Sequence, residues 1–457
     1  MAIATTNPTT GQIVREFDSL TEAQVDEALG RAVRCFTDYR TTSLEQRAGW
    51  LRATADLLEA EADDVAAMMT LEMGKTLKSA KAETLKCAKA FRYYAEHGAS
   101  MIDDEIVDAG AVGASKAYMR YQPLGVILAV MPWNFPLWQA VRFIAPALMA
   151  GNVGILKHAS NVPQSALYID DVLRRAGFPE GCLQTLLIGS DMIEGILRDP
   201  RVQAATLTGS EPAGRAVAAV AGDEVKHTVL ELGGSDPFIV MPSADITKAA
   251  STAVTARVQN NGQSCIAAKR FIVHADVYDE FVDAFVDGFR ALVVGDPTDD
   301  KTDVGPLATE QGRDDLEQLV DDAVSKGAKV LIGGQRVDRN GWFYEPTVIA
   351  GVTADMDLYS AEAFGPVATL YRVDGIEQAI TIANDTPFGL GGNAWTTDPD
   401  EQDRFIDAIE SGQVFINGMT TSYPELGFGG VKRSGYGREL TQHGIREFCN
   451  VKTVWIG

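Results

Sequence analysis

Two residues in this chain of 457 combine a reactive side chain with surroundings that suit catalysis. Cys265 ends the stretch Asn-Asn-Gly-Gln-Ser-Cys, whose polar, turn-forming residues differ from the apolar surroundings of a structural cysteine. Glu231 follows an apolar run and precedes two glycines, so its carboxylate can act as a general base where water reaches it. A small core residue and a surface glutamate at a strand end are the simpler interpretations. The other four cysteines lie in helical patterns or near element ends and are predicted to be structural.

Two further segments have the composition of ligand-binding loops. Residues 131–136, Met-Pro-Trp-Asn-Phe-Pro, follow an apolar run at the point where α/β proteins bind ligands, and the Asn134 amide can donate hydrogen bonds there. Residues 208–210, Thr-Gly-Ser, precede a helix that we expect to begin at Pro212, which leaves backbone N–H groups free for an anion. A rigid turn and an ordinary strand-to-helix turn are the alternatives. A nucleoside-triphosphate loop is excluded, because Arg-Ala follows Gly214 where Lys-Ser or Lys-Thr is required.

The composition excludes several classes of partner. The chain has 40 basic and 63 acidic residues, and the net charge of −23 repels nucleic acid and anionic lipid. An anionic substrate would therefore need cations placed within its site. The five cysteines are scattered without CxxC spacing, which argues against disulfides and zinc and indicates a reducing compartment. The first residues lack signal-peptide features, and the best apolar run, 124–131, is too short to span a bilayer. We expect a cytoplasmic protein that binds no metal, membrane or nucleic acid.

Apolar periodicity indicates the elements that position these residues. Ser43 and Gln46 form a capping-box pattern, and an amphipathic stripe predicts helix to about residue 95, broken near 73–75. From residue 125 onward, short apolar runs alternate with helical segments, which is typical of parallel β-sheet units. The alternation restarts after Glu231 and so predicts two α/β domains. The expected strands are 125–130, 153–156, 202–207, 237–241 and 270–274, and the expected helices include 137–149, 212–220 and 247–260.

Two segments are predicted to be strands outside both α/β units, namely 104–122 and the tail 448–457. The tail alternates with period two and can pair with residues 115–121. Paired strands that project from a domain commonly serve assembly.

Taken together, these segments resemble the NAD(P)-dependent aldehyde dehydrogenase superfamily, and the motifs occur in the family's order across nearly the whole chain. They are PWNFP at 132–136, LKHAS at 156–160, LTGS at 207–210, ELGGSDPF at 231–238, NGQSC at 261–265, EAFGPV at 362–367 and GFGGVKRSGYGRE at 427–439. The resemblance implies an aldehyde dehydrogenase-like α/β fold with two open α/β domains and a projecting β-hairpin that forms a homo-oligomer, dimer or tetramer. It assigns 1–103 and 123–230 to a cofactor-binding domain, 231–435 to a catalytic domain, and 104–122 with 436–457 to oligomerisation strands.

The same resemblance implies roles for individual residues. Cys265 resembles the nucleophile that attacks the aldehyde carbon, and Glu231 resembles the base that activates water for thioester hydrolysis. Asn134 resembles the side-chain half of the oxyanion hole, with the Cys265 backbone N–H as the other half. The residues implied to contact the cofactor are Trp133, Asn134, Lys157, His158, Ser160, Gly209, Ser210, Leu232, Glu362 and Phe364.

One departure from the family pattern bears on the cofactor. Many members have a glutamate at the position of Ser160, where it binds the adenosine ribose hydroxyls. Serine removes a negative charge that would repel a 2′-phosphate, and Lys157 lies nearby in the sequence. The sequence therefore predicts NADP, with NAD as the alternative.

The substrate prediction rests on a stronger resemblance to succinate-semialdehyde dehydrogenases, whose substrate is a small aldehyde with a carboxylate. Arg142 matches an arginine that binds this carboxylate, and Ser422 and Tyr423 are candidate further donors. The group's second arginine is Gln259 here, and Ala267 replaces the second cysteine of a redox switch. A snorkelling surface arginine is the simpler interpretation of Arg142.

The alternatives are the same chemistry on glutarate semialdehyde or an aliphatic aldehyde, or a non-catalytic binding protein on the same fold. A third alternative transfers the acyl group to coenzyme A, and Glu231 argues against it by providing for hydrolysis. The presence of Cys265, Glu231 and Asn134 together argues against a non-catalytic role, because only catalysis needs all three.

Overall fold

A parallel sheet formed by the apolar runs of the first half supports the predicted site. The computed structural model describes residues 2–457. Five strands of this sheet are parallel, and their side chains are mostly buried on both faces, which explains why they appear in the sequence as continuous apolar runs. The order is β17 (Gly435–Tyr436), β9 (His227–Glu231), β8 (Val202–Thr208), β5 (Val126–Met131), β6 (Val153–His158) and β7 (Leu183–Thr185).

The edge strand β17 comes from the far end of the chain. It pairs antiparallel with β9, so that Gly435 lies opposite Glu231 and Tyr436 opposite Leu230. The Leu232 N–H also donates to the carbonyl of Ser434 at 2.9 Å. The backbone that carries Glu231 is therefore held by a segment about two hundred residues later in sequence.

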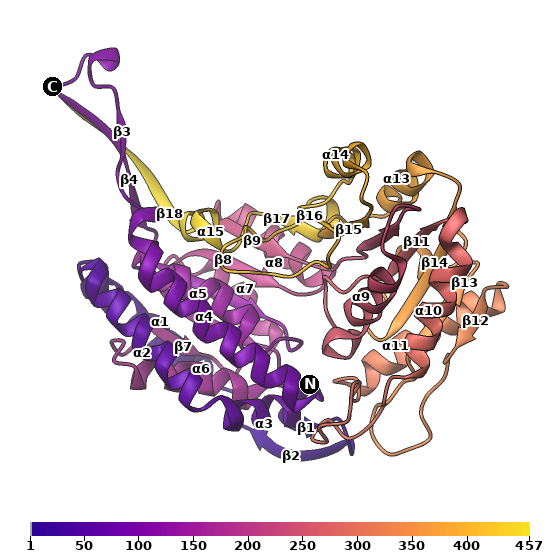
Figure 1. Ribbon diagram of the computed structural model, residues 1–457. Coiled ribbons are helices and arrows are strands. Elements are labelled where there is room, and N and C mark those ends of the chain that lie inside the picture. The colour runs from indigo at the N-terminus through magenta and orange to yellow at the C-terminus, as the bar shows by residue number, and fades with distance from the viewer. Residues whose placement is uncertain (1) are drawn as a thin grey trace.

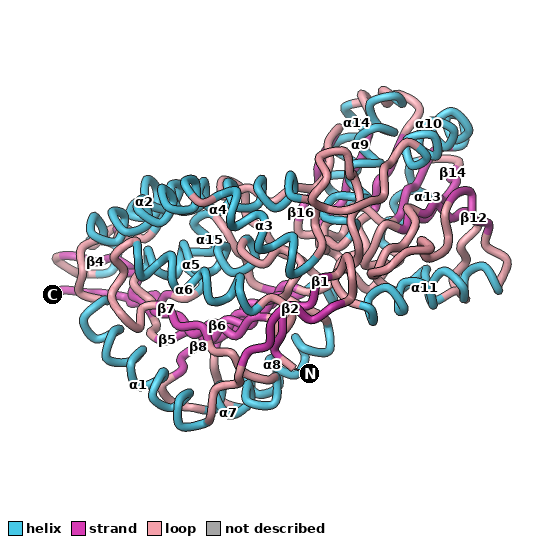
Figure 2. Tube along the Cα trace, turned by 90° about the horizontal axis from the view of Figure 1, so that it is seen from below, coloured by secondary structure: helices cyan, strands magenta, loops and turns pink. Residues whose placement is uncertain are grey.

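Helices cover both faces of this sheet, with α2, α4 and α5 on one side and α1, α7 and α8 on the other (Figure 2). The capping box predicted at Ser43 and Gln46 is confirmed, and Thr21 with Gln24 forms another at the start of α1. The helices of this half are α1 (Glu22–Tyr39), α2 (Leu44–Ala60), α3 (Ala62–Met73), α4 (Leu77–Met101), α5 (Trp138–Ala150), α6 (Pro163–Arg175), α7 (Ile193–Arg198) and α8 (Glu211–Asp223). A hairpin of β1 (Ile3–Asn7) and β2 (Gln12–Phe17) precedes them.

A second sheet of seven strands forms the other half of the molecule (Figure 1). Six of its strands are parallel, and β12 pairs antiparallel with β13 at one edge. The order is β12 (Lys329–Ile332), β13 (Thr347–Ala350), β14 (Val367–Val373), β11 (Arg270–His274), β10 (Pro237–Val240), β15 (Gly391–Trp395) and β16 (Gln413–Ile416). Its helices are α9 (Ile246–Val258), α10 (Tyr278–Arg290), α11 (Glu310–Ser325), α12 (Asp357–Ser360), α13 (Ile376–Asn384) and α14 (Pro399–Ala408).

A three-stranded antiparallel sheet projects from the first half and carries the C-terminal strand (Figure 1). It consists of β3 (Glu105–Val107), β4 (Lys116–Pro123) and β18 (Cys449–Ile456). The predicted pairing of the tail with 115–121 is confirmed, because β18 runs beside β4 from Cys449 opposite Pro123 to Ile456 opposite Lys116.

The boundaries predicted for these strands need two corrections. Residues 104–122 contain a 3₁₀ turn, Gly110–Val112, between β3 and β4. Residues 436–457 are not strand throughout, because α15 (Thr441–Glu447) lies within them and only β18 belongs to the projecting sheet. Gly444 and Ile445 of α15 are buried against α4 and α5, so this segment packs on the first half. Among residues 2–457, no helix is long and apolar enough to cross a membrane.

Candidate active site

A cavity of about 280 Å³ lies where the carboxyl ends of β5, β8 and β9 meet the loop that carries Cys265. This is the edge at which parallel α/β sheets bind ligands. The rings of Trp133 and Phe364 meet edge to face there, with centroids 5.6 Å apart. The lining residues are Pro132, Trp133, Asn134, Gln139, Thr208, Gly209, Ser210, Leu232, Gly233, Cys265, Glu362 and Phe364. The structure therefore brings Cys265 and Asn134 together with most of the predicted cofactor residues.

A buried arginine shapes the backbone just before Cys265. Arg257, at the end of α9, donates through Nη2 to the carbonyls of Gly262 and Gly365 at 2.5 and 2.6 Å. Gly262 has φ 76°, and a Cβ there would lie 2.3 Å from the carbonyl carbon of Gly365. Only glycine can bring its backbone this close to Gly365. The glycine of the Asn-Gly-Gln-Ser sequence is therefore needed for the turn to pack against residues 362–367.

A buried lysine holds the backbone of Cys265 itself. Lys269 Nζ donates to the carbonyls of Ser264 and Cys265 at 2.8 and 2.7 Å, and it lies 3.2 Å from Glu362 Oε1. With both carbonyls engaged, the loop is fixed so that the Cys265 side chain reaches the cavity.

The Cys265 thiol lies in an environment that keeps it protonated. Burial raises its pKa to about 12, although the positive charges of Arg142 and Lys269 partly oppose the shift. A thiolate therefore forms at neutral pH only if a base removes the proton or a bound ligand adds a stabilising interaction.

The Asn134 side chain is buried and held in one orientation. Its Nδ2 donates to the carbonyl of Gln263 at 3.2 Å, and its Oδ1 lies 3.5 Å from Gln139 Nε2. The Asn260 amide donates to the Asn134 carbonyl at 2.7 Å. The amide is thus held directly against the loop that carries Cys265, as an oxyanion donor would need to be.

Glu231, at the end of β9, is buried and is not one of the residues that line the cavity. A Cβ on Gly429 would lie 3.0 Å from Glu231 Oε1, so the carboxylate rests against this glycine. Within residues 2–457 neither carboxylate oxygen has a hydrogen-bond partner of good geometry, although the nearby Gly430 backbone slightly favours the charged form. Burial, together with the Glu439 charge, raises the pKa of Glu231 well above its usual range. Its carboxylate must turn toward Cys265 to act on water there.

Lys157 and His158, two of the residues predicted to contact the cofactor, differ in whether their polar side-chain atoms are free to bind a ligand. Lys157 is mostly buried, burial lowers its pKa, and its Nζ has no acidic or hydrogen-bonding partner among residues 2–457. An unpaired buried ammonium fits an anionic ligand such as a phosphate. His158 instead uses both ring nitrogens internally: Nδ1 accepts from the Ala159 N–H and Nε2 lies 2.7 Å from the Pro136 carbonyl. Only its backbone and ring face are left for a cofactor.

Arg142 is a buried residue, so its interpretation as a surface arginine is wrong. Its Nε lies 2.6 Å from Glu439 Oε2 in an ion pair whose angle falls short of a hydrogen bond, and its guanidinium lies 4.3 Å from the Phe428 ring centroid. Burial raises the pKa of the Cys265 thiol and that of the Glu231 carboxyl, and the positive charge of Arg142 opposes part of both rises. The single cation of this apolar helix is thus paired with Glu439 and is close enough to Cys265 and Glu231 to act on both electrostatically.

Ser422 joins the loop after β16 to the first half of the molecule. Its Oγ accepts a hydrogen bond from Trp138 Nε1 at 2.8 Å and another from Lys86 Nζ at 2.9 Å. Ser422 is buried, whereas the neighbouring Tyr423 is largely exposed. Of the two predicted donors, only Ser422 lies inside the protein.

Comparison with known proteins places the chain in a family. The sequence model of the aldehyde dehydrogenase family matches residues 1–454. The chain belongs to the aldehyde dehydrogenase family. It is 71% identical to succinate-semialdehyde dehydrogenase [NADP(+)] of Mycobacterium avium (strain 104), over 100% of this chain and 97% of that protein. It is 70% identical to succinate-semialdehyde dehydrogenase [NADP(+)] 1 of Mycobacterium tuberculosis (strain ATCC 25618 / H37Rv), with 100% of each chain covered.

Solved structures of aldehyde dehydrogenases have the same fold. Succinic semialdehyde dehydrogenase from Streptococcus pyogenes, crystallised with NADP+, superposes with a TM-score of 0.96 at 37% identity over 99% of each chain. The succinate-semialdehyde dehydrogenase of Burkholderia pseudomallei gives 0.96 at 35% identity, over 99% of this chain and 94% of that one. The predicted aldehyde dehydrogenase-like α/β fold is therefore confirmed.

Several residues of this aldehyde dehydrogenase site were not predicted. Lys269 follows Cys265 by four residues, and the basic pair Lys269-Arg270 before the apolar run 271–273 was the one signal in the sequence. Glu439 ends the motif at 427–439 and pairs with Arg142, and only the motif itself pointed to it. Lys86 lies within a segment predicted to be helix, and nothing in that pattern indicated a role in the site.

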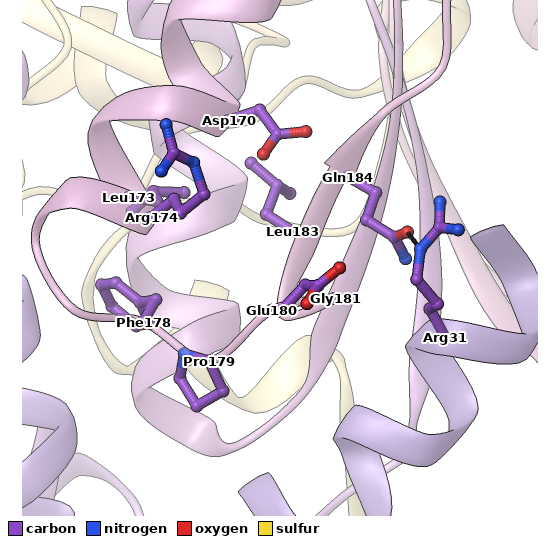
Figure 3. Close-up of a pocket in the computed structure, with 10 residues that line it drawn as sticks. All are labelled: Arg31, Asp170, Leu173, Arg174, Phe178, Pro179, Glu180, Gly181, Leu183 and Gln184. Atoms are coloured by element: carbon purple, nitrogen blue, oxygen red, sulfur yellow. Dashed lines mark hydrogen bonds between the residues drawn. The ribbon is translucent and has the colours of Figure 1, made fainter.

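A larger hollow elsewhere on this aldehyde dehydrogenase contains none of the predicted residues. It has a volume of about 440 Å³ and lies between α1, α6 and β7 (Figure 3). Two of its polar side chains are already engaged: Arg31 Nε donates to Gln184 Oε1 at 2.9 Å, and Asp170 Oδ2 accepts from the Thr185 N–H. Volume alone therefore does not identify the reactive site.

Proposed function

We propose that this aldehyde dehydrogenase oxidises succinate semialdehyde to succinate with NADP, NAD being the alternative oxidant. The observation that supports this substrate is the buried guanidinium of Arg142, whose positive charge opposes part of the rise that burial causes in the pKa of Cys265 and is therefore felt at the reacting thiol. In a protein of net charge −23, this is the local cation that a substrate carboxylate requires. The names of relatives at about 70% identity support the same substrate and cofactor.

The first step assigned to the chain is nucleophilic attack by the Cys265 sulfur on the aldehyde carbon. The Asn134 amide and the Cys265 backbone N–H stabilise the oxyanion that forms, and both are held in place before the reaction by the contacts of the loop. Because the thiol is protonated in the free enzyme, its proton must leave as the substrate binds or as the bond forms.

The second half of the reaction releases the acid. When bound, NADP supplies the nicotinamide ring that accepts the hydride from the thiohemiacetal carbon. Cys265 then holds the acyl group as a thioester, and Glu231 takes a proton from the water that attacks it. The C–S bond breaks, succinate leaves, and Cys265 regains its proton. The raised pKa of Glu231 makes its carboxylate a stronger base than an exposed glutamate.

The preference for NADP rests on Lys157 and Ser160. Lys157 offers an unpaired buried ammonium at the end of β6, and Ser160 places a small neutral side chain three residues later. A glutamate at position 160 would lie near the same ligand and repel a 2′-phosphate.

The proposed function is tested by the kcat/KM of the purified enzyme for succinate semialdehyde, glutarate semialdehyde and butanal, each with NADP and with NAD. We expect succinate semialdehyde with NADP to rank first. A higher value for butanal would reject the carboxylate assignment, and a higher value with NAD would reject the cofactor preference.

We also propose that the enzyme is a cytoplasmic homo-oligomer, dimer or tetramer, that assembles through β3, β4 and β18. Large apolar side chains are exposed on this projecting sheet, including Ile106 at 76% and Trp455 at 54%. Such side chains commonly mark an interface. Light scattering coupled to size exclusion gives the mass, and a monomer would reject the assembly.

A further inference from the structure

Lys86 lies near Arg142, close enough for the two positive charges to act on each other. Its Nζ donates to Ser422 Oγ at 2.9 Å and lies 4.2 Å from the centroid of the Trp138 ring. Trp138 and Arg142 are four residues apart on α5, so they lie on one face of that helix. Lys86 on α4 and Arg142 on α5 therefore approach the same region from two helices.

The position of Lys86 is fixed by the residue one turn earlier on α4. Glu83 Oε1 accepts from the backbone N–H groups of Leu137 and Trp138, both at 2.9 Å. This contact anchors α4 to the first turn of α5, and Lys86, three residues later, is thereby held beside Trp138. Gln139, the next residue of α5, lines the cavity that holds Cys265.

Lys86 has no opposite charge of its own. No carboxylate lies within 4 Å of its Nζ among residues 2–457, whereas Arg142 is paired with Glu439. Burial and the neighbouring Arg142 lower the pKa of Lys86 to about 8, so it is mainly charged at neutral pH. A partly buried cation beside another cation is stabilised when an anion binds between them.

The hydroxyl of Ser422 keeps a donor that no protein group among residues 2–457 uses, beside Lys86. Its oxygen already accepts from Lys86 and from Trp138, which uses both lone pairs. The hydroxyl proton has no protein acceptor within the described chain, so it remains available for a ligand oxygen. Lys86 likewise uses one of its three N–H donors on Ser422.

We propose that Lys86 binds the carboxylate of the substrate, together with Ser422 and Arg142, and so determines the selectivity for an aldehyde that carries a carboxylate. This inference rests on the proposed function and adds a residue from α4 to its substrate site.

The test compares Lys86→Met with the wild-type enzyme, using the ratio of kcat/KM for succinate semialdehyde to that for butanal at saturating NADP. Methionine keeps a side chain of similar length and removes the charge. We expect the ratio to fall about 10- to 100-fold through KM for succinate semialdehyde, as for the loss of a hydrogen bond between charged groups. Lys86→Arg should restore most of the ratio, which a packing role would not require.

The matched control is Lys81→Met, on the same helix. Lys81 is exposed and pairs with Asp63 at 2.6 Å, so its loss should leave the ratio unchanged. NADP affinity and the midpoint of thermal unfolding report the fold of each variant, and Lys86→Gln replaces Lys86→Met if the latter does not fold.

The outcomes separate the two proposals. An unchanged ratio in a folded Lys86→Met variant, or equal losses for both aldehydes, overturns the role of Lys86 and leaves the proposed substrate in place. A wild-type enzyme that does not prefer succinate semialdehyde overturns both.

Discussion

Glu83 and Glu231 are both buried glutamates of the first half, and they differ in how their oxygens are used. Glu83 binds Lys75 through one oxygen and accepts two backbone N–H groups of α5 through the other. Glu231 has no such partner among residues 2–457 and lies against a glycine. A buried carboxylate whose oxygens are all bonded stabilises the fold, whereas one left without partners keeps a raised pKa and is available for proton transfer.

Cys265→Ala should have the largest effect on activity and almost none on the fold. We expect no measurable dehydrogenase turnover, because the sulfur forms the bond to substrate, and an unchanged midpoint of thermal unfolding. Turnover is measured as spectrophotometric NADPH formation, and the unfolding midpoint is measured by a thermal melt. Turnover like that of the wild type would contradict the role assigned to Cys265.

Glu231→Gln should separate the two halves of the reaction. We expect a burst of about one NADPH per active site, followed by turnover lowered by about 10²- to 10⁴-fold, because hydrolysis lacks its base. Mass spectrometry should find an acyl group on Cys265 after the burst. An unmodified Cys265 would show that the base acts elsewhere. Stability should be retained, since a neutral amide suits this buried position.

Asn134→Ala should lower kcat by about 10²- to 10³-fold, the usual loss for one oxyanion donor. The measurement is kcat and KM for succinate semialdehyde with NADP. A change confined to KM would make Asn134 a residue that positions substrate, with no part in stabilising the oxyanion.

Glu83→Gln should behave in the opposite way to Glu231→Gln. It leaves Lys75 as a buried cation without its partner, so we expect the free energy of unfolding to fall by about 3–5 kcal/mol. Denaturant titration followed by tryptophan fluorescence measures the change. Steady NADPH formation without a burst should remain, because Glu231 is unchanged. A variant as stable as the wild type would contradict the structural role of Glu83.

The smallest expected effect is a pH dependence of substrate preference. The pKa of Lys86 is lowered to about 8, so its charge is present below that pH and is lost as the pH rises through it. The kcat/KM ratio of succinate semialdehyde to butanal should therefore decrease above about pH 8. The ionisable groups around Lys86 are Arg142, Glu83, Cys87 and Lys75. Titration of Cys265 affects both aldehydes, so it cancels in the ratio of succinate semialdehyde to butanal. A constant ratio from pH 7 to 9 would contradict the assignment.

Sequence alone predicted the parts of the molecule that depend on local pattern. The buried strands β5, β6 and β8 appear as short apolar runs, and the segments that follow β5, β8 and β9 contain the loops that line the cavity. The position of Cys265 in a turn also follows from its polar neighbours.

Contacts between distant segments could not be predicted in this way. Lys86 and Ser422 are 336 residues apart in the chain, and within its helix Lys86 has the pattern of an ordinary half-exposed lysine. The internal bonds of His158 and the orientation of Glu231 toward Gly429 depend on tertiary contacts that no spacing encodes. The family resemblance supplied roles for these residues, but their partners required the structure.

The pairing of Gly435 with Glu231 also affects the order of events during synthesis on the ribosome. The two residues are 204 positions apart, so at 5–20 residues per second β17 emerges roughly 10–40 s after β9. During that interval β9 has an open edge, which is the kind of strand that pairs with other nascent chains. Glu231 reaches its final backbone position only when synthesis is nearly finished, so truncated chains that end before residue 435 should accumulate as inactive, aggregation-prone species.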